Sequence, residues 1–238
     1  MASPRVAYLE VANRLREQIL AGHLSAGDRL PTEAELCDRF GVSRSTIREA
    51  LRMLSSQRLV KTSRGVGGGS SVAHIRHDDV TDLLRDSIVL LTQTEGASVD
   101  ELLEVHELLE VPAARLAAVR RSEVQLTRLR ATIPHSLDDV DLRLIFEVNR
   151  SFHDVLLESA GNRLLRVVTE PLFTVMQTRF LRDRASMEFW HLVMREHASI
   201  LEAIEAGDPE RAGHQMEDHL IHLRATYEAI DAHVERAP

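Results

Sequence analysis

The chain of 238 residues contains a single cysteine, Cys37, and aromatic residues make up only 4% of it. One cysteine excludes an intrachain disulfide framework and fits a reducing compartment. The scarcity of aromatic residues, beside 44% hydrophobic residues, favours helices over a β-sandwich. Lysine is almost absent as well, since Lys61 stands alone against 28 arginines. We interpret that bias as the codon usage of a GC-rich genome.

Long hydrophobic segments are also missing. No run of 18 apolar residues occurs, and the N-terminal MASPRVAYLE does not have the form of a signal peptide. We therefore expect a soluble protein of the cytoplasm, without membrane contact. The length allows one large domain or two modest ones, with an apolar core.

Net charge is divided unevenly along the chain. Residues 1–76 hold 12 basic against 7 acidic side chains, a net charge of +5. Residues 77–238 hold 17 against 30, a net charge of −13, which gives −8 for the whole chain. This division predicts that only the first part meets phosphates and that the acidic remainder repels DNA.

The sequence LPTEAELCDRFGVSRSTIREALRML, residues 30–54, predicts two short helices joined by a tight turn. Thr32 and Glu35 have capping-box spacing, so the first helix should begin directly after Thr32. Gly41 should end that helix and Ser43 should cap the next. The buried face of the second helix has apolar residues at helical spacing. They are Ile47, Ala50, Leu51 and Leu54.

The opposite face of the second helix carries arginine and hydroxyl side chains. They are Arg44, Ser45, Arg48 and Arg52. Such a helix is the form that enters a DNA major groove, because arginine pairs bidentately with guanine. A solvated surface helix is the alternative for one such helix alone, but the complete two-helix unit favours DNA binding.

A helix at about residues 6–21 should precede this unit, and a β-hairpin should follow it. Its strands are expected at residues 59–62 and 71–73, around a glycine-rich turn at 65–69. The sequence disfavours a nucleotide-binding loop, since no Lys-Ser/Thr pair and no helix start follow the glycines. A wing on the DNA is the better interpretation, with phosphate contacts from Lys61 and Arg64.

The segment GHLSAGDRLPTEAELCDRFGVSRSTIREALRML, followed by RGVGGGSSV, resembles the winged helix-turn-helix of the GntR family of bacterial transcription regulators. The resemblance covers about residues 8–74. It implies that the glycine turn, including Gly67, is the wing tip. The positions that match the operator-reading residues of the family are Ser43, Arg44, Ser45 and Arg48. Family members often carry an arginine with a further DNA contact where this chain has Ala34.

From about Asp78 onward the sequence predicts roughly six helices, which form an antiparallel bundle. One helix follows a capping box at Ser98 and Glu101, and Pro112 should kink it or end it early. Its expected apolar stripe is Leu102, Val105, Leu109, Ala113 and Leu116. The other helices expected run over residues 138–159, over 162–184 with a break near Pro171, over 186–206, and from Pro209 onward.

Polar residues fill gaps in the apolar stripes of three of these helices. Asn149 takes the gap in the first, with His153 one turn on, while His197 and His219 fill the gaps in the other two. Imidazoles that converge in a bundle are ligands for Zn²⁺, Ni²⁺ or Mn²⁺, with positions left open for water or a ligand. A hydrogen-bonded core residue is the alternative for each histidine alone. Four other histidines fall off the stripes and should be solvated, with one of them, His222, at the border of the pocket.

The stretches EVHELLEVPAARLAA, NRSFHDVLLESAGNRLL and EHASILEAIEAGDPERAGHQMEDHL are similar to the FCD effector domain of FadR-type GntR regulators, over about residues 80–230. The resemblance implies a divalent metal, with zinc the first choice, held by an aspartate and three histidines under a small carboxylate effector. The matching positions are Asn149, His153, His197 and His219. Asn149 replaces the usual aspartate and brings no charge. His106 stands where many members have an arginine that faces the pocket.

Two further pairs of side chains have alternative interpretations. Arg150 and Arg195 adjoin the site helices and could reach an anionic effector, with surface ion pairs as the alternative. Glu107 and Glu110 are interpreted as helix-surface residues rather than as acid–base groups.

We therefore predict a mainly α protein with a winged helix-turn-helix domain at residues 1–75, a linker at 76–80 and a helical effector-binding and dimerisation domain at 81–238. It should act as a homodimeric repressor on double-stranded operator DNA. The effector, an organic acid, should contact the metal in a pocket with His106, Arg150 and His222. One alternative is a direct metal sensor. Another is a metal-dependent enzyme, which is disfavoured because the spacing puts no carboxylate beside the three histidines.

Overall fold

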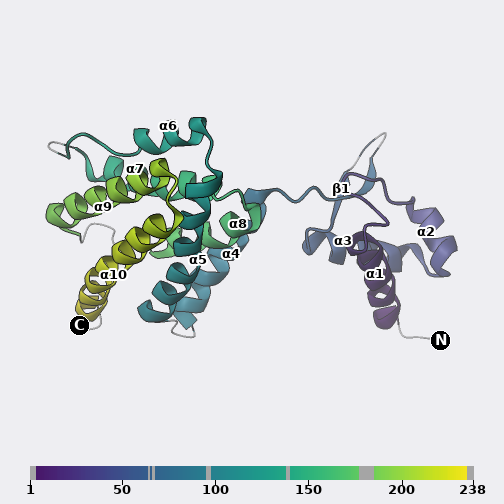
Figure 1. The fold of residues 1–238 in the computed structure, drawn as a ribbon. Helices are drawn as coiled ribbons and strands as arrows, with labels where there is room; N and C mark the ends of the chain where they lie inside the picture. The colour runs from purple at the N-terminus through teal and green to yellow at the C-terminus, as the bar shows by residue number, and fades with distance from the viewer. Residues whose placement is uncertain are drawn as a thin grey trace. The chain divides into compact units, whose positions relative to one another are not determined.

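The computed structural model describes residues 4–63, 65, 68–94, 98–137, 140–176 and 185–234. The chain forms two compact units, Met1–Arg76 and His77–Pro238 (Figure 1). Each unit has its own apolar core. The described residues are mainly helical and include a two-stranded sheet in the first unit. The predicted fold class is thereby confirmed.

Three helices and a hairpin make up the first unit. They are α1 (Pro4–Leu20), α2 (Glu33–Phe40), α3 (Arg44–Ser56), β1 (Val60–Ser63) and β2 (Gly69–Val72). The helix α3 contacts α1, α2 and β1, so it is the centre of this unit. Its buried face is the predicted one, because Ile47, Ala50 and Leu54 are fully buried and Leu51 is 6% exposed.

The helix α2 begins and ends at the predicted residues, and α3 begins directly after the predicted cap. Thr32 and Glu35 form the capping box, in which the Glu35 carboxylate accepts from the Thr32 backbone N–H at 2.7 Å. Gly41, with a φ of +64°, ends α2 in the left-handed conformation that favours glycine. Ser43 caps α3 by accepting from the backbone N–H of Thr46. The turn between α2 and α3 is therefore fixed by local hydrogen bonds.

The wing is connected to the segment before α2. The strands β1 and β2 pair antiparallel, with Val60 opposite Val72. On its other side, β2 forms a bridge between Ser71 and Arg29, and the Leu30 N–H donates to the Ser70 carbonyl at 2.9 Å. The start of the helix-turn-helix is thus held against the wing.

Seven described helices form the second unit. They are α4 (His77–Thr94), α5 (Val99–Arg120), α6 (Glu123–Ala131), α7 (Leu142–Ser159), α8 (Arg163–Met176), α9 (Met187–Ala206) and α10 (Pro209–Val234). The helix α5 contacts α7, α8, α9 and α10, and is therefore the centre of the bundle. The helix α4 packs on α8, and α6 packs on α7.

Two helices of this unit begin at other residues than expected. The expected linker at 76–80 is largely helical, since α4 begins at His77 and has two aspartates in its first turn, where they interact favourably with the helix dipole. The helix α7 begins at Leu142 and not near Asp138, because Asp141 caps it.

Neither Pro112 nor Pro171 ends its helix. The helix α5 continues through Pro112 to Arg120 instead of ending early, and Pro171 lies inside α8. Packing of α5 against four other helices offsets the hydrogen bond that a proline removes. The expected end of α8 near residue 184 lies outside the described residues. None of the helices described here has the length and apolar character needed to cross a membrane.

Candidate functional site

The outer face of α3 carries the side chains that were predicted from the sequence to contact DNA. Arg44, Ser45, Arg48 and Arg52 are all exposed. Ser43 is exposed as well, but its hydroxyl takes part in the cap, 2.8 Å from the hydroxyl of Ser45. The position of these residues on one face of α3 follows from the burial of the opposite face.

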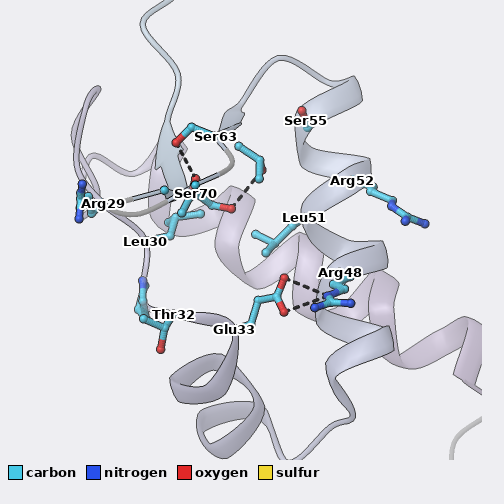
Figure 2. Close-up of a pocket in the computed structure, with 15 residues that line it drawn as sticks. Arg29, Leu30, Thr32, Glu33, Arg48, Leu51, Arg52, Ser55, Ser63 and Ser70 are labelled. Carbon is cyan, nitrogen blue, oxygen red and sulfur yellow. Dashed lines mark hydrogen bonds and ion pairs between the residues drawn. The ribbon is translucent and has the colours of Figure 1, made fainter.

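A groove of about 820 Å³ lies beside this face of α3 (Figure 2). Arg48 and Arg52 line it from α3, Arg29 from the segment before α2, and Ser63 and Ser70 from the wing. Guanidinium and hydroxyl groups are the ones that bind phosphates and the edges of bases. This groove is therefore a candidate nucleic-acid interface.

Ion pairs hold two of the arginines. The Nε of Arg48 donates to both carboxylate oxygens of Glu33, at 2.9 and 3.1 Å. Arg52 pairs with Glu49 at 3.4 Å. The side chains of Arg48 and Arg52 nevertheless remain 61% and 78% exposed, so both are accessible to a ligand.

The predicted phosphate contacts of the wing are only partly described. Lys61 is exposed on β1. Arg64 and Gly67, the other two residues predicted for the wing, lie outside the described residues.

Three buried imidazoles converge in the second unit. His153 of α7 is 1% exposed, and His197 of α9 and His219 of α10 are fully buried. Their ring nitrogens lie within 4.8 Å of one another. The three helices therefore bring together the histidines predicted from the gaps in their apolar stripes.

Carboxylates orient two of the rings. The Nδ1 of His153 lies 2.7 Å from a Glu110 oxygen, and the Nδ1 of His219 lies 2.7 Å from a Glu196 oxygen. Among the described residues, the Nε2 atoms of both rings have no hydrogen-bond partner. The ring of His197 stacks on Phe152 at 3.9 Å, and neither of its nitrogens has a partner within the same described part of the chain.

The unpartnered nitrogens fit a divalent metal. A buried polar atom without a partner is costly, and a carboxylate on the remote nitrogen of a histidine is the usual outer contact of a metal ligand. Burial lowers the pKa of His197, and the neighbouring His219 and His153 lower it further. Burial also lowers the pKa of His219, against the opposing effect of its hydrogen bond with Glu196. Both imidazoles are therefore held in the neutral form that binds metals.

A second group of titratable side chains adjoins the first. Glu110 is fully buried, and its carboxylate lies between His153 and His106. The Nε2 of His106 is 3.2 Å from Oε1 of Glu110. Burial alone would raise the pKa of Glu110, but His153 and His106 together hold it below its usual value. His106 itself is 1% exposed, with its ring against Phe173 at 5.8 Å. The carboxylate is thus kept charged inside the bundle.

The other predicted site residues fall into a buried pair, Asn149 and His106, and an exposed pair, Arg150 and His222. Asn149 is 4% exposed on α7, one turn before His153. Arg150 is half exposed, pairs with Glu170 at 3.5 Å and lines a separate cavity of about 210 Å³. His222 is 54% exposed and contacts the second oxygen of Glu196. Only His106 of the three predicted pocket residues adjoins the histidine cluster directly.

Two carboxylates of the site were missed or misinterpreted. Glu110 is not on the helix surface, whereas Glu107 is 42% exposed and lies 4.0 Å from Arg224. The expectation that no carboxylate lies beside the three histidines is therefore wrong. The spacing of Glu110, four residues after His106 and three before Ala113, could have indicated its burial. No comparable signal marked Glu196.

Known proteins resemble the chain over both units. The model of the bacterial regulatory proteins of the gntR family matches residues 7–68, and that of the FCD domain matches residues 101–222. The HTH-type transcriptional regulator LutR of Bacillus subtilis (strain 168) is 30% identical over 85% of this chain and 92% of LutR. The galactonate operon transcriptional repressor of Escherichia coli (strain K12) is 28% identical over 83% of this chain and 86% of its own length.

Among solved structures, that of Streptococcus agalactiae GntR has a TM-score of 0.50 and 25% identity, over 92% of this chain and 99% of its own. With both family models and a relative at 30% identity in agreement, the chain belongs to the GntR family of bacterial regulatory proteins, carries an FCD domain, and is a transcription regulator rather than an enzyme.

Proposed function

We propose that this regulator is a homodimeric repressor that releases double-stranded operator DNA when a small carboxylate effector binds at a divalent metal in its second unit. We assign DNA binding to residues 1–75, and effector binding and dimerisation to residues 81–238. The observation that carries the proposal is the convergence of three buried imidazoles with unpartnered nitrogens.

His153, His197 and His219 would hold the metal, with the amide oxygen of Asn149 as a fourth donor. Glu110 and Glu196 contact the Nδ1 atoms of His153 and His219 and so keep the ring proton on Nδ1. The Nε2 atom of each ring is then free to bind the metal. Imidazole ligands suit zinc best and also suit nickel, and manganese remains a third candidate. When bound, such an ion supplies a positive charge that attracts a carboxylate.

The galactonate operon repressor supports a hydroxy acid as the class of effector. Galactonate is a hydroxy acid, and the name of that relative also describes it as a repressor. A panel of hydroxy acids that includes galactonate is therefore the first to test. We place His106 at the edge of the effector pocket, with His222 and Arg150 farther out. Binding of the effector must differ in free energy between the DNA-bound and released states to act as a signal.

For DNA reading, we propose that Arg44, Ser45 and Arg48 contact base edges from α3, with Ser43 at its N-cap. Arg52, Lys61, Arg64 and Gly67 would contact phosphates and fix the register. The exposure of Arg44, Ser45, Arg48 and Arg52 on one face of α3, and the groove beside that face, support this division of roles.

Elemental analysis of the purified protein tests the metal site. We expect about one divalent ion per chain, and its loss in His197→Ala. The control is His214→Ala, which removes a histidine that is 69% exposed on α10 and should keep the ion. Wild-type protein that holds no metal after dialysis against zinc, nickel or manganese salts would contradict the proposal.

A direct metal sensor is the second candidate. The neutral Asn149 favours it, because a site with one charge less holds its ion more weakly and exchanges it more readily. Titration of operator binding with zinc, nickel or manganese alone separates the two functions. A sensor would respond to the ion itself, whereas the proposed repressor would respond only when a hydroxy acid is also present.

A further inference from the structure

The contact between Glu33 and Arg48 joins the two helices of the helix-turn-helix. Glu33 lies in the first turn of α2, directly after the Thr32 cap, and Arg48 lies 15 residues later on α3. Figure 2 shows the carboxylate in contact with the guanidinium, and both residues line the groove. The capping box fixes the start of α2 and with it the backbone of Glu33, from which the carboxylate reaches Arg48.

The atoms used in this contact matter for recognition. Both carboxylate oxygens accept from Nε, at 2.9 and 3.1 Å. An arginine reads guanine through two parallel hydrogen bonds to O6 and N7, and its terminal Nη1 and Nη2 groups can form them. The contact with Glu33 therefore uses the edge of the guanidinium that end-on reading of a base does not need.

The charge of Glu33 acts in the same direction. Its side chain is 39% exposed and lines the groove. A carboxylate at this place repels a DNA phosphate but does not repel the acceptor atoms of guanine to the same extent, since those carry only partial charges. Arg48 is thereby disfavoured as a phosphate contact, although arginine ordinarily binds phosphates well.

We infer that Glu33 is a positioning residue that aims Arg48 at a base edge and so contributes to operator specificity. The inference rests on the proposed DNA-reading role of Arg48. Glu33 touches the arginine and not the DNA, so its removal changes which sequences are bound more than how tightly DNA is bound in general.

The test is a selection from double-stranded DNA with a randomised segment of about 20 base pairs, which accommodates two half-sites one helical turn apart. Full-length wild type, Glu33→Gln and Arg48→Gln are compared. We expect both variants to lose the guanine preference at the same position of each half-site, by about tenfold. The double variant should discriminate no worse than Arg48→Gln alone.

Two controls separate positioning from folding and from charge. Glu33→Asp keeps the negative charge in the first turn of α2 but shortens the side chain, so it should lose the same preference at an unchanged thermal midpoint. Glu10→Gln removes a carboxylate from another exposed arginine pair, with Arg14 at 3.0 Å on α1, and should keep the preference.

Non-specific binding provides a second readout. For Glu33→Gln, affinity for a duplex without the selected site should stay the same or rise, since the variant no longer repels phosphates. Retention of the guanine preference in Glu33→Gln, while Arg48→Gln loses it, would overturn the inference alone. Retention in Arg48→Gln would overturn both the inference and the proposed role of Arg48.

Discussion

At the scale of single residues, Glu107 and Glu110 lie three positions apart on one helix but have different surroundings. Glu107 is half exposed and lies near Arg224, whereas Glu110 is fully buried between two imidazoles. A buried carboxylate is costly unless charged or hydrogen-bonding partners compensate it. Glu110 has such partners in His153 and His106, so its contribution is to hold those rings.

We expect Glu110→Gln to weaken metal binding about 10- to 100-fold, because the amide orients the ring of His153 less strongly than the carboxylate does. Competition with a chelator of known affinity measures the change. Glu107→Gln is the matched control on the same helix and should bind metal like the wild type. Equal affinities in the two variants would show that Glu110 does not support the metal site.

At the scale of elements, features that depend on interactions between nearby residues could be predicted from the sequence. The cap at Thr32, the end of α2 at Gly41 and the buried face of α3 were all predicted, since each depends on residues within a few positions of one another. The face of α5 was predicted only in part, since Leu102 and Ala113 are buried and Leu109 and Leu116 pack against the core. Val105, assigned to its apolar stripe, is 40% exposed, and His106 is buried instead.

The reason is that α5 contacts four other helices, so its buried surface extends around more of its circumference than one stripe. Alanines pack on this surface, and they give a weak pattern in sequence. The histidine cluster was nevertheless predictable, because each imidazole interrupts a regular stripe on its own helix. Glu110 and Glu196 each lie on a different helix from the ring that they contact, so only the three-dimensional structure brings each carboxylate to its histidine.

Gly41 provides a test at this scale. Its φ of +64° disfavours any residue with a Cβ, although no heavy atom lies within 4 Å of the position such a Cβ would take. We expect Gly41→Ala to destabilise the first unit by about 1 kcal/mol through backbone strain alone. Gly41→Asn should recover part of the loss, since asparagine tolerates this conformation better. The stabilities of both variants are measured by thermal unfolding, with the loss of DNA binding as the signal. Equal stability of wild type and Gly41→Ala would contradict the explanation.

At the scale of the whole molecule, charge and chemistry are divided between the two units. The first holds a net charge of +5 and the arginine-lined groove, and the second holds −13 and the buried histidines. A signal from the second unit must therefore act on DNA binding through a coupling free energy between the two sites.

Metal removal tests this division. Dialysis against a chelator is expected to leave operator binding within a few-fold of its original affinity, because the groove contains no part of the histidine cluster. The same treatment should abolish the change in affinity that a hydroxy acid of the panel causes. Fluorescence anisotropy of labelled operator DNA measures both effects. Loss of operator binding on chelation alone would favour the direct metal sensor.

The bridge between Arg29 and Ser71 has a consequence for the behaviour of the protein at high concentration. Since β2 lies between β1 and the segment before α2, β1 is the outer strand of the wing. It has only four residues, and three of them, Lys61, Thr62 and Ser63, are exposed and polar. A short polar strand is a poor template for pairing with another chain. At high concentration the protein should therefore not aggregate through its wing.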